Sequence, residues 1–194
     1  NVTGWGPMKS FELEFLLKRT LKKLGLDRST IGIDYGQEMC MAGGLLLAYE
    51  YDKFKETFPE AKFKSFTDAM DRIQNIKETE EIVLLRRASE VTDAGQQACK
   101  EWGSWVGMTE TQLAGVAEQA MRNAGSDWAW TITGGQEIGS GYRTWYPWGG
   151  CTPASNKIIQ PGDCVLLDLH SMYQLYYGDL SHNYFMGNPT SEQK

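Results

Sequence analysis

DLHSMYQLYYGD, residues 168–179, is the stretch that decides how the second half of this chain folds. It follows an apolar run and carries apolar and aromatic residues on both sides of a short turn. This pattern predicts an antiparallel hairpin, with one strand from Cys164 to Leu169 and the other from Tyr176 to Phe185. The stretch opens and closes with an aspartate, and its apolar surroundings give no evident reason for the two carboxylates.

The two aspartates are predicted to lie opposite each other. A symmetric turn centred between residues 173 and 174 places Asp168 across from Asp179, with their Cβ atoms roughly 5 Å apart. Like charges at that spacing are destabilising, and burial adds a desolvation cost. A bound divalent cation would offset both costs, and two ions a few ångströms apart could share these ligands and activate a water. The alternative is that one or both carboxylates face solvent at the hairpin ends.

Composition limits the class of protein and of partner. The chain has 194 residues, 41% of them hydrophobic, which is enough for one large or two modest folded domains. A net charge of −6 argues against nucleic acid and against anionic membranes as partners. None of the four cysteines forms a C-x-x-C pair, which favours free thiols over a zinc or disulfide motif. With no signal-peptide pattern in residues 1–10, these features predict a cytoplasmic protein.

The first third of the chain alternates predicted helices and strands. Helices are expected at Ser10–Leu24 and Leu45–Phe58, and short strands at Thr30–Asp34 and Lys62–Phe66. This alternation is typical of an α/β unit.

The rest of the chain predicts helices followed by antiparallel strands. Glu78–Trp102 is the clearest helix, with an apolar stripe that ends at Trp102. Thr109–Gln112 is a capping box for a second helix, which is expected to end at Gly125. The fold class expected from about residue 75 onward is therefore α+β.

Four segments of the chain share a family pattern: IKETEEIVLLRRASEVTDAG (76–95), GMTETQLAGVAEQAMRNAG (107–125), IIQPGDCVLLDL (158–169) and YYGDLSHNYFMGNPTSEQK (176–194). They resemble the pita-bread-fold enzymes, a family that includes Xaa-Pro dipeptidases (prolidases), aminopeptidase P, methionine aminopeptidase and creatinase. The resemblance implies that residues 73–194 are the first part of a pita-bread catalytic domain. It also implies that residues 1–72 are the end of the family's N-terminal α/β domain.

The resemblance implies a role for the two aspartates. In metal-dependent members they are the first two of five ligands, and one His and two Glu follow. Asp168 and Asp179 are thus expected to bind two divalent metal ions, of manganese, cobalt, zinc or iron, in an enzyme that cleaves the bond before proline. The aspartate pair favours this branch over creatinase, which lacks it. The family also implies a homodimer in the full-length protein.

The sequence departs from the family pattern in several places. The chain stops at Lys194, before the His and Glu ligands, so a fragment that is inactive alone is expected. Cys151 stands where the family has a substrate-contacting His; it either contacts a changed substrate or packs in a Gly-rich loop. His182 replaces a common Arg, and His170 lies two positions after Asp168. His182 is either a neighbour of the metal ligands or an ordinary strand residue. His170 is a metal ligand, a neighbour of the metal ligands or a surface residue.

An aromatic cluster has two interpretations. Its members either wall a pocket for proline or a quaternary cation, with Trp148 as a substrate-binding candidate, or fill the core and loops. They are Trp128, Trp130, Trp145, Tyr146 and Trp148. Glu137 and Arg143, in the same stretch, receive no role.

Three functions therefore compete. The first is a metallopeptidase of Xaa-Pro type acting on a small peptide. The second is a creatinase-like hydrolase or a lyase acting on a small amidine, urea or sulfonium compound, which the cysteine and the tryptophans favour. The third is a non-catalytic homologue that binds a peptide or partner.

Overall fold

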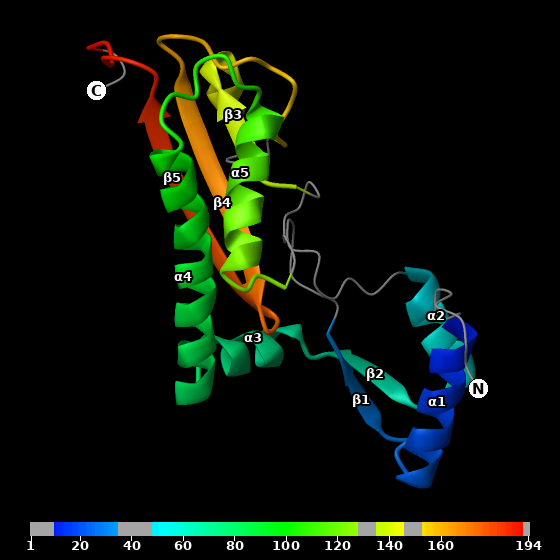
Figure 1. The fold of residues 1–194 in the computed structure, drawn as a ribbon. Coiled ribbons are helices and arrows are strands. Elements are labelled where there is room, and N and C mark those ends of the chain that lie inside the picture. The colour runs from blue at the N-terminus through cyan, green and yellow to red at the C-terminus, as the bar shows by residue number, and fades with distance from the viewer. Residues whose placement is uncertain (1–9, 35–47, 128–134, 146–152, 192–194) are drawn as a thin grey trace, which may run out of the picture. The chain divides into compact units, whose positions relative to one another are not determined.

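A computed structural model describes residues 10–34, 48–127, 135–145 and 153–191 (Figure 1). The chain divides into two compact units, Asn1–Ile76 and Lys77–Lys194. None of the helices in the described residues is long and apolar enough to cross a membrane.

The described residues of the first unit form a two-stranded parallel sheet and three helices. Its elements are α1 (Ser10–Lys23), β1 (Thr30–Ile33), α2 (Ala48–Thr57), β2 (Lys62–Ser65) and α3 (Thr67–Asn75). Thr30 pairs with Lys62 and Ile33 with Ser65 in a parallel register. The α/β prediction is confirmed here, and α3 is a helix that the sequence did not predict.

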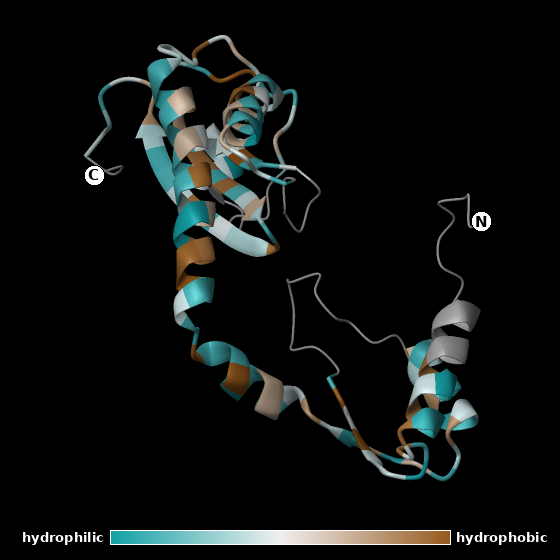
Figure 2. Cartoon of the chain, turned by 60° about the horizontal axis from the view of Figure 1, so that its bottom comes forward, coloured by the Kyte–Doolittle hydropathy of each residue, from teal (hydrophilic) through white to brown (hydrophobic). Residues whose placement is uncertain are grey.

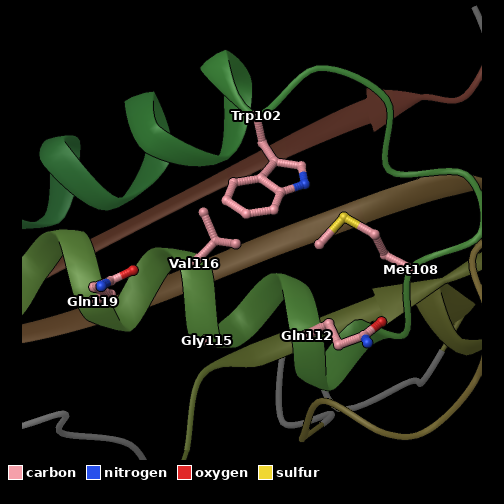
Figure 3. A pocket seen from close by; sticks show the side chains of 6 residues that line it. All are labelled: Trp102, Met108, Gln112, Gly115, Val116 and Gln119. Carbon is pink, nitrogen blue, oxygen red and sulfur yellow. The ribbon is translucent and has the colours of Figure 1, made fainter.

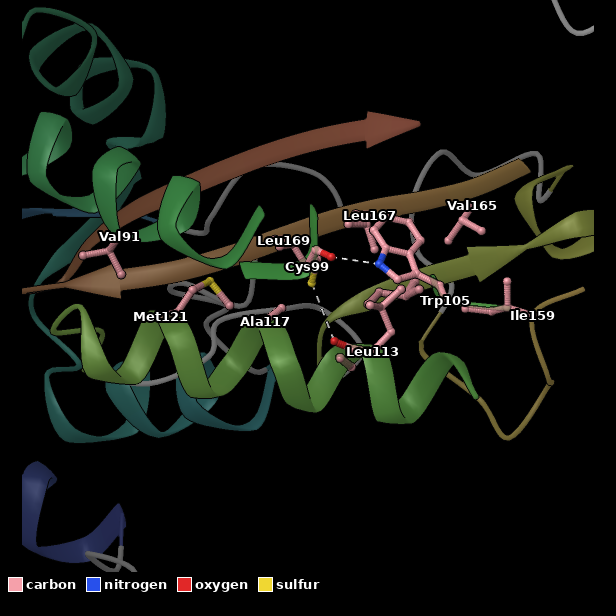
Figure 4. Packing of buried hydrophobic residues seen from close by; sticks show 12 residues of the cluster. Val91, Cys99, Trp105, Leu113, Ala117, Met121, Ile159, Val165, Leu167 and Leu169 are labelled. Carbon is pink, nitrogen blue, oxygen red and sulfur yellow. Dashed lines mark hydrogen bonds between the residues drawn. The ribbon is translucent and has the colours of Figure 1, made fainter. Parts of the chain in front are cut away.

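The second unit packs helices against an antiparallel sheet of order β3-β4-β5. Its elements are α4 (Thr79–Glu101), α5 (Glu110–Asn123), β3 (Glu137–Ser140), the 3₁₀ turn η1 (Gly141–Trp145), β4 (Cys164–Tyr173) and β5 (Tyr176–Phe185). The core lies between the helices and the sheet, where Leu113 and Met121 of α5 meet Leu167 and Leu169 of β4 (Figure 4). The α+β prediction is therefore confirmed.

Helix α4 is amphipathic, and apolar and polar residues alternate along it in Figure 2. Its buried side includes Ala88, Val91 and Cys99. The predicted end of this stripe is wrong, because Trp102 is 58% exposed. The buried indole at this end belongs to Trp105, whose Nε1–H donates to the Cys99 carbonyl at 2.8 Å.

Side-chain caps fix the start of α5 and a glycine its end. The Thr109 hydroxyl accepts from the Gln112 N–H at 3.1 Å, and the Gln112 side chain accepts from the Thr109 N–H at 2.9 Å. Gly125 follows with φ +108°, a conformation that side chains disfavour. The predicted capping box and helix stop are confirmed.

The predicted hairpin forms, but its first strand runs to Tyr173 rather than to Leu169, and the predicted register is wrong by two residues. Asp168 pairs with Ser181, and Asp179 pairs with His170. Because the shift is an even number, every side chain keeps its predicted face. The two aspartates therefore share a face as neighbours on a diagonal rather than as a direct pair.

The turn explains the difference. The strands close on the two-residue loop Gln174-Leu175, with φ values of 48° and 68°. Positive φ at both positions is the geometry of a type I′ turn, which normally carries Asn-Gly. The Asp127 carboxylate accepts from the Gln174 N–H at 2.6 Å. A contact from a distant segment thus holds a turn that the local sequence does not signal.

Candidate metal centre

One face of the β3–β4–β5 sheet gathers carboxylates around a histidine. Glu137 of β3 pairs with Asp168 of β4, and His170 of β4 pairs with Asp179 of β5. Directly paired residues, and residues two apart on a strand, project to the same face. The four side chains therefore share one face of the sheet, while Leu167 and Leu169 project from the other face toward the helices.

The donor atoms of this cluster are close together. One ligand atom each of Glu137, Asp168 and His170 lie within 4.8 Å of one another. The His170 Nε2 atom is 3.7 Å from Asp168 Oδ1 and 3.6 Å from Asp179 Oδ1. The side chains of Asp168 and His170 are 13% and 8% exposed, whereas that of Asp179 is 56% exposed. The cluster is thus buried on the side of β3 and open on the side of β5.

Hydrogen bonds fix the inner part of the cluster. The Ser181 hydroxyl donates to Asp168 Oδ1 at 2.5 Å and orients that carboxylate. The buried Gln136 side chain accepts from the His170 N–H at 2.8 Å and donates to the His170 carbonyl at 3.0 Å. These contacts hold the backbone of β4 where its two ligand candidates project.

The composition of the cluster suits a divalent metal ion. Three carboxylates and one imidazole give an excess of negative charge, which a divalent cation offsets. Carboxylate oxygen and imidazole nitrogen are common ligands of divalent transition metals. The residues present therefore fit such an ion.

A second buried carboxylate braces this sheet. Glu110, at the start of α5, is fully buried. It accepts hydrogen bonds from the backbone and hydroxyl of Ser140 at 2.8 and 2.7 Å, and from those of Ser155 at 3.1 and 2.6 Å. Arg143 Nε also donates to it, at 2.9 Å. Glu110 thus ties the end of β3 and the segment near residue 155 to α5.

The structure separates His182 from the cluster. His182 pairs with Leu167, so it projects to the opposite face from Asp168 and Asp179. Its ring lies 5.9 Å from that of Tyr184, on the helix side of β5. His170, in contrast, lies among the carboxylates.

Several predicted substrate contacts fall outside the described residues. They are Cys151, Trp148, Trp128, Trp130 and Tyr146, and the side chain of Trp145 is not described either.

Two described cysteines are free thiols whose pKa is raised above the ordinary value. Burial raises the pKa of Cys99 to about 12. Burial, followed by the charge of Asp163, also raises the pKa of Cys164. Both thiols are therefore protonated at neutral pH.

A groove on the helix side of the sheet is lined by uncharged residues and offers no carboxylate or imidazole ligand. It has a volume of about 390 Å³ and lies between the end of α4 and α5 (Figure 3). Its lining residues carry no charge: Trp102, Met108, Gln112, Gly115, Val116 and Gln119. The carboxylate face is therefore the stronger candidate for chemistry.

Sequence reasoning missed Glu137 and Glu110. Glu137 lies in a four-residue strand that the sequence does not resolve from the surrounding loops. Its only local signal is the short alternating run after Gly134-Gly135. Glu110 reads as an acidic residue in the first turn of a helix, because its partners lie 30 to 45 residues away.

Known proteins resemble this chain in sequence and in fold. The model of Metallopeptidase family M24 matches residues 83–194. The Xaa-Pro dipeptidase of Pyrococcus furiosus is 31% identical over 143 residues, which cover 74% of this chain and 39% of that protein.

Solved structures share the fold of this chain. The prolidase from Pyrococcus furiosus superposes with a TM-score of 0.70 and 27% identity, covering 89% of this chain and 47% of its own. The X-Pro aminopeptidase from Thermotoga maritima superposes with a TM-score of 0.75 and 23% identity, covering 93% and 46%. The chain thus spans less than half the length of these relatives.

Proposed function

The chain belongs to metallopeptidase family M24, and on that premise we propose that the sheet face of Asp168 and Asp179 binds two divalent metal ions in a peptidase acting on Xaa-Pro peptides. The resemblance drawn from the sequence, including the partial pita-bread fold, is confirmed at the level of family and fold. The observation that carries the proposal is the convergence of Glu137, Asp168 and His170 donor atoms within 4.8 Å.

Asp168 and Asp179 are the proposed metal ligands. Asp168 is held by Ser181 in a mostly buried position, whereas Asp179 lies at the open edge of the cluster. Their carboxylates provide hard anionic oxygens for manganese, cobalt, zinc or iron. Such ions, when bound, polarise a peptide carbonyl and activate a water for hydrolysis. The chain's own contribution is to fix the donors and to surround them with buried sheet.

The substrate proposal rests on the relatives. The proteins that this chain resembles are named Xaa-Pro dipeptidase and prolidase. We therefore assign a dipeptide with a C-terminal proline as the substrate, a homodimer as the working form of the natural-length protein, and Cys151 and Trp148 as residues that contact the substrate. The carboxylate cluster favours this function over creatinase-like or lyase chemistry.

The test is hydrolysis of Xaa-Pro dipeptides by the natural-length protein. We expect cleavage of Ala-Pro that a chelator abolishes and that added Mn²⁺ or Co²⁺ restores. The D168N variant should lose at least about 100-fold in activity, because removing a ligand exceeds the 10–100-fold loss typical of an outer contact.

The matched control is D93N, which neutralises an exposed aspartate on α4. It should keep the activity of the parent. Failure of the folded, metal-loaded parent to cleave any Xaa-Pro dipeptide would refute the substrate assignment. Activity that survives removal of the metal would refute the mechanism.

A further inference from the structure

His170 is not one of the metal ligands proposed above, yet its side chain lies among the carboxylates of the cluster. Its imidazole lies between two aspartates, one on its own strand and one on the neighbouring strand. Glu137 adds a third carboxylate from β3. His170 is 6% exposed, so this position is built into the sheet rather than adopted by a surface side chain.

The two distances differ from those of hydrogen bonds. An N–H donor and a carboxylate oxygen in a hydrogen bond are about 2.7–3.2 Å apart. His170 Nε2 lies 3.7 Å from Asp168 Oδ1 and 3.6 Å from Asp179 Oδ1. Both carboxylates are therefore near this nitrogen without being hydrogen-bonded to it.

The same distances match a shared metal ion. Bonds from a divalent transition metal to nitrogen and oxygen are about 2.0–2.2 Å long, so two donors on one ion lie about 3 to 4.3 Å apart. Both observed distances fall inside this range. Glu137 adds a further donor from β3, because one ligand atom each of Glu137, Asp168 and His170 lie within 4.8 Å of one another.

We infer that His170 is itself a metal ligand, whose Nε2 joins Asp168 and Asp179, with Glu137 beside them, to form a mixed nitrogen and oxygen site for one divalent transition-metal ion. This inference rests on the proposed function for the role of the two aspartates. It adds a nitrogen donor that lies inside the hairpin itself. One ion can thus be held entirely by residues 137–179.

The nitrogen donor has a consequence for metal preference. Imidazole suits zinc, copper, iron and nickel, whereas sites made of carboxylates alone suit magnesium, calcium and manganese. We therefore expect the chain to bind Zn²⁺ at least about 10-fold more tightly than Mg²⁺, and this preference should fall when the imidazole is removed.

The sequence makes the test direct, because the 194-residue chain has only two histidines. His170 lies in the cluster and His182 projects to the opposite face, so H182Q is a matched control for H170Q. The chain, stripped of metal, would receive about half an equivalent of Cu²⁺ and be examined by pulsed electron paramagnetic resonance for coupling to imidazole nitrogen. Zn²⁺ affinity would be measured by calorimetry, and folding by circular dichroism.

We expect imidazole coupling in the parent and in H182Q, and its loss in H170Q. Zn²⁺ affinity should fall at least about 10-fold in H170Q and remain within about twofold of the parent in H182Q. If H170Q does not fold, the coupling that persists in H182Q assigns the nitrogen to His170.

Other outcomes overturn the inference in distinct ways. Metal bound without imidazole coupling, or coupling lost only in H182Q, would refute a His170 ligand and leave the proposed metallopeptidase intact. Binding of no metal by the folded parent chain would refute the inference outright. Imidazole coupling in the parent chain and in H182Q, together with a natural-length protein that cleaves no Xaa-Pro dipeptide, would instead refute the proposed function alone.

Discussion

Replacing Glu110 by alanine should destabilise the Lys77–Lys194 unit by about 4 kcal/mol. The carboxylate is fully buried and pairs with Arg143, whose side chain is 19% exposed. Breaking a buried ion pair by removing one partner costs about 3–5 kcal/mol, because the remaining charge loses its compensation. The N–H and hydroxyl donors of Ser140 and Ser155 also lose their acceptor. Since Arg143 can reach water, the expected loss lies in the middle of this range.

Urea unfolding, followed by circular dichroism, measures this loss. At a slope of about 1–3 kcal/mol per molar urea, the midpoint should fall by at least about 1.3 M. E90A is the control, because Glu90 forms an exposed pair with Arg87 at 64% and 45% exposure. It should cost under about 1 kcal/mol.

A second substitution tests the cause. R143M in the E110A background removes the uncompensated guanidinium and should restore about 1–2 kcal/mol. A loss below about 1 kcal/mol in E110A, or no recovery in the double variant, would refute the role assigned to this buried pair.

Three further predictions concern the hairpin and its contacts. In G178A, the added Cβ would overlap the Thr92 hydroxyl and the Ala88 carbonyl oxygen on α4, so the free energy of unfolding should fall by about 3 kcal/mol. An unchanged free energy would refute this close packing. L175G should raise the unfolding free energy by about 0.5–1 kcal/mol, because glycine adopts the φ of 68° without strain; no gain would refute a strained turn. The pKa of Glu81 is lowered, first by a hydrogen bond from the Glu78 backbone and then by one from the Tyr176 hydroxyl. The ionised Glu81 carboxylate therefore stabilises the fold above its ordinary pKa of 4.5, and this stabilisation disappears as the pH falls through the lowered value. The melting temperatures of the parent and E81Q should therefore differ at pH 7 and converge in acid, and a difference independent of pH would refute the coupling.

Local signals explain which parts of the fold were predictable. Thr109 and Gly125 mark the ends of α5, because capping and left-handed termination depend on residues adjacent in sequence. The second strand of the hairpin was predicted with its observed bounds, whereas the first was predicted to end at Leu169 instead of Tyr173. The hairpin register was not predictable, because Gln174 and Leu175 lack the residues typical of their turn.

The candidate site was predictable only in part. Asp168 and Asp179 stand out as carboxylates on apolar strands, and the correct face follows from alternation alone. The nearness of His170 to Asp179 required the true register. Glu137 required the pairing of β3 with β4 across about thirty residues of chain, which no local pattern encodes.

The burial of Glu110 illustrates the same limit. A glutamate in the first turn of a helix is usually a surface residue that favours the helix dipole. Here Ser140, Arg143 and Ser155 converge on it from distant segments, and tertiary packing turns it into a buried anchor.

Measuring metal content is the sharpest test of a two-metal site on the sheet face of Asp168 and Asp179. Elemental mass spectrometry would be applied to the natural-length protein, purified without added metal, and to its D168N variant. We predict close to two transition-metal ions per chain in the parent and their loss in the variant. A folded parent that contains no transition metal, and acquires none on incubation with Mn²⁺, Co²⁺ or Zn²⁺, would contradict this prediction.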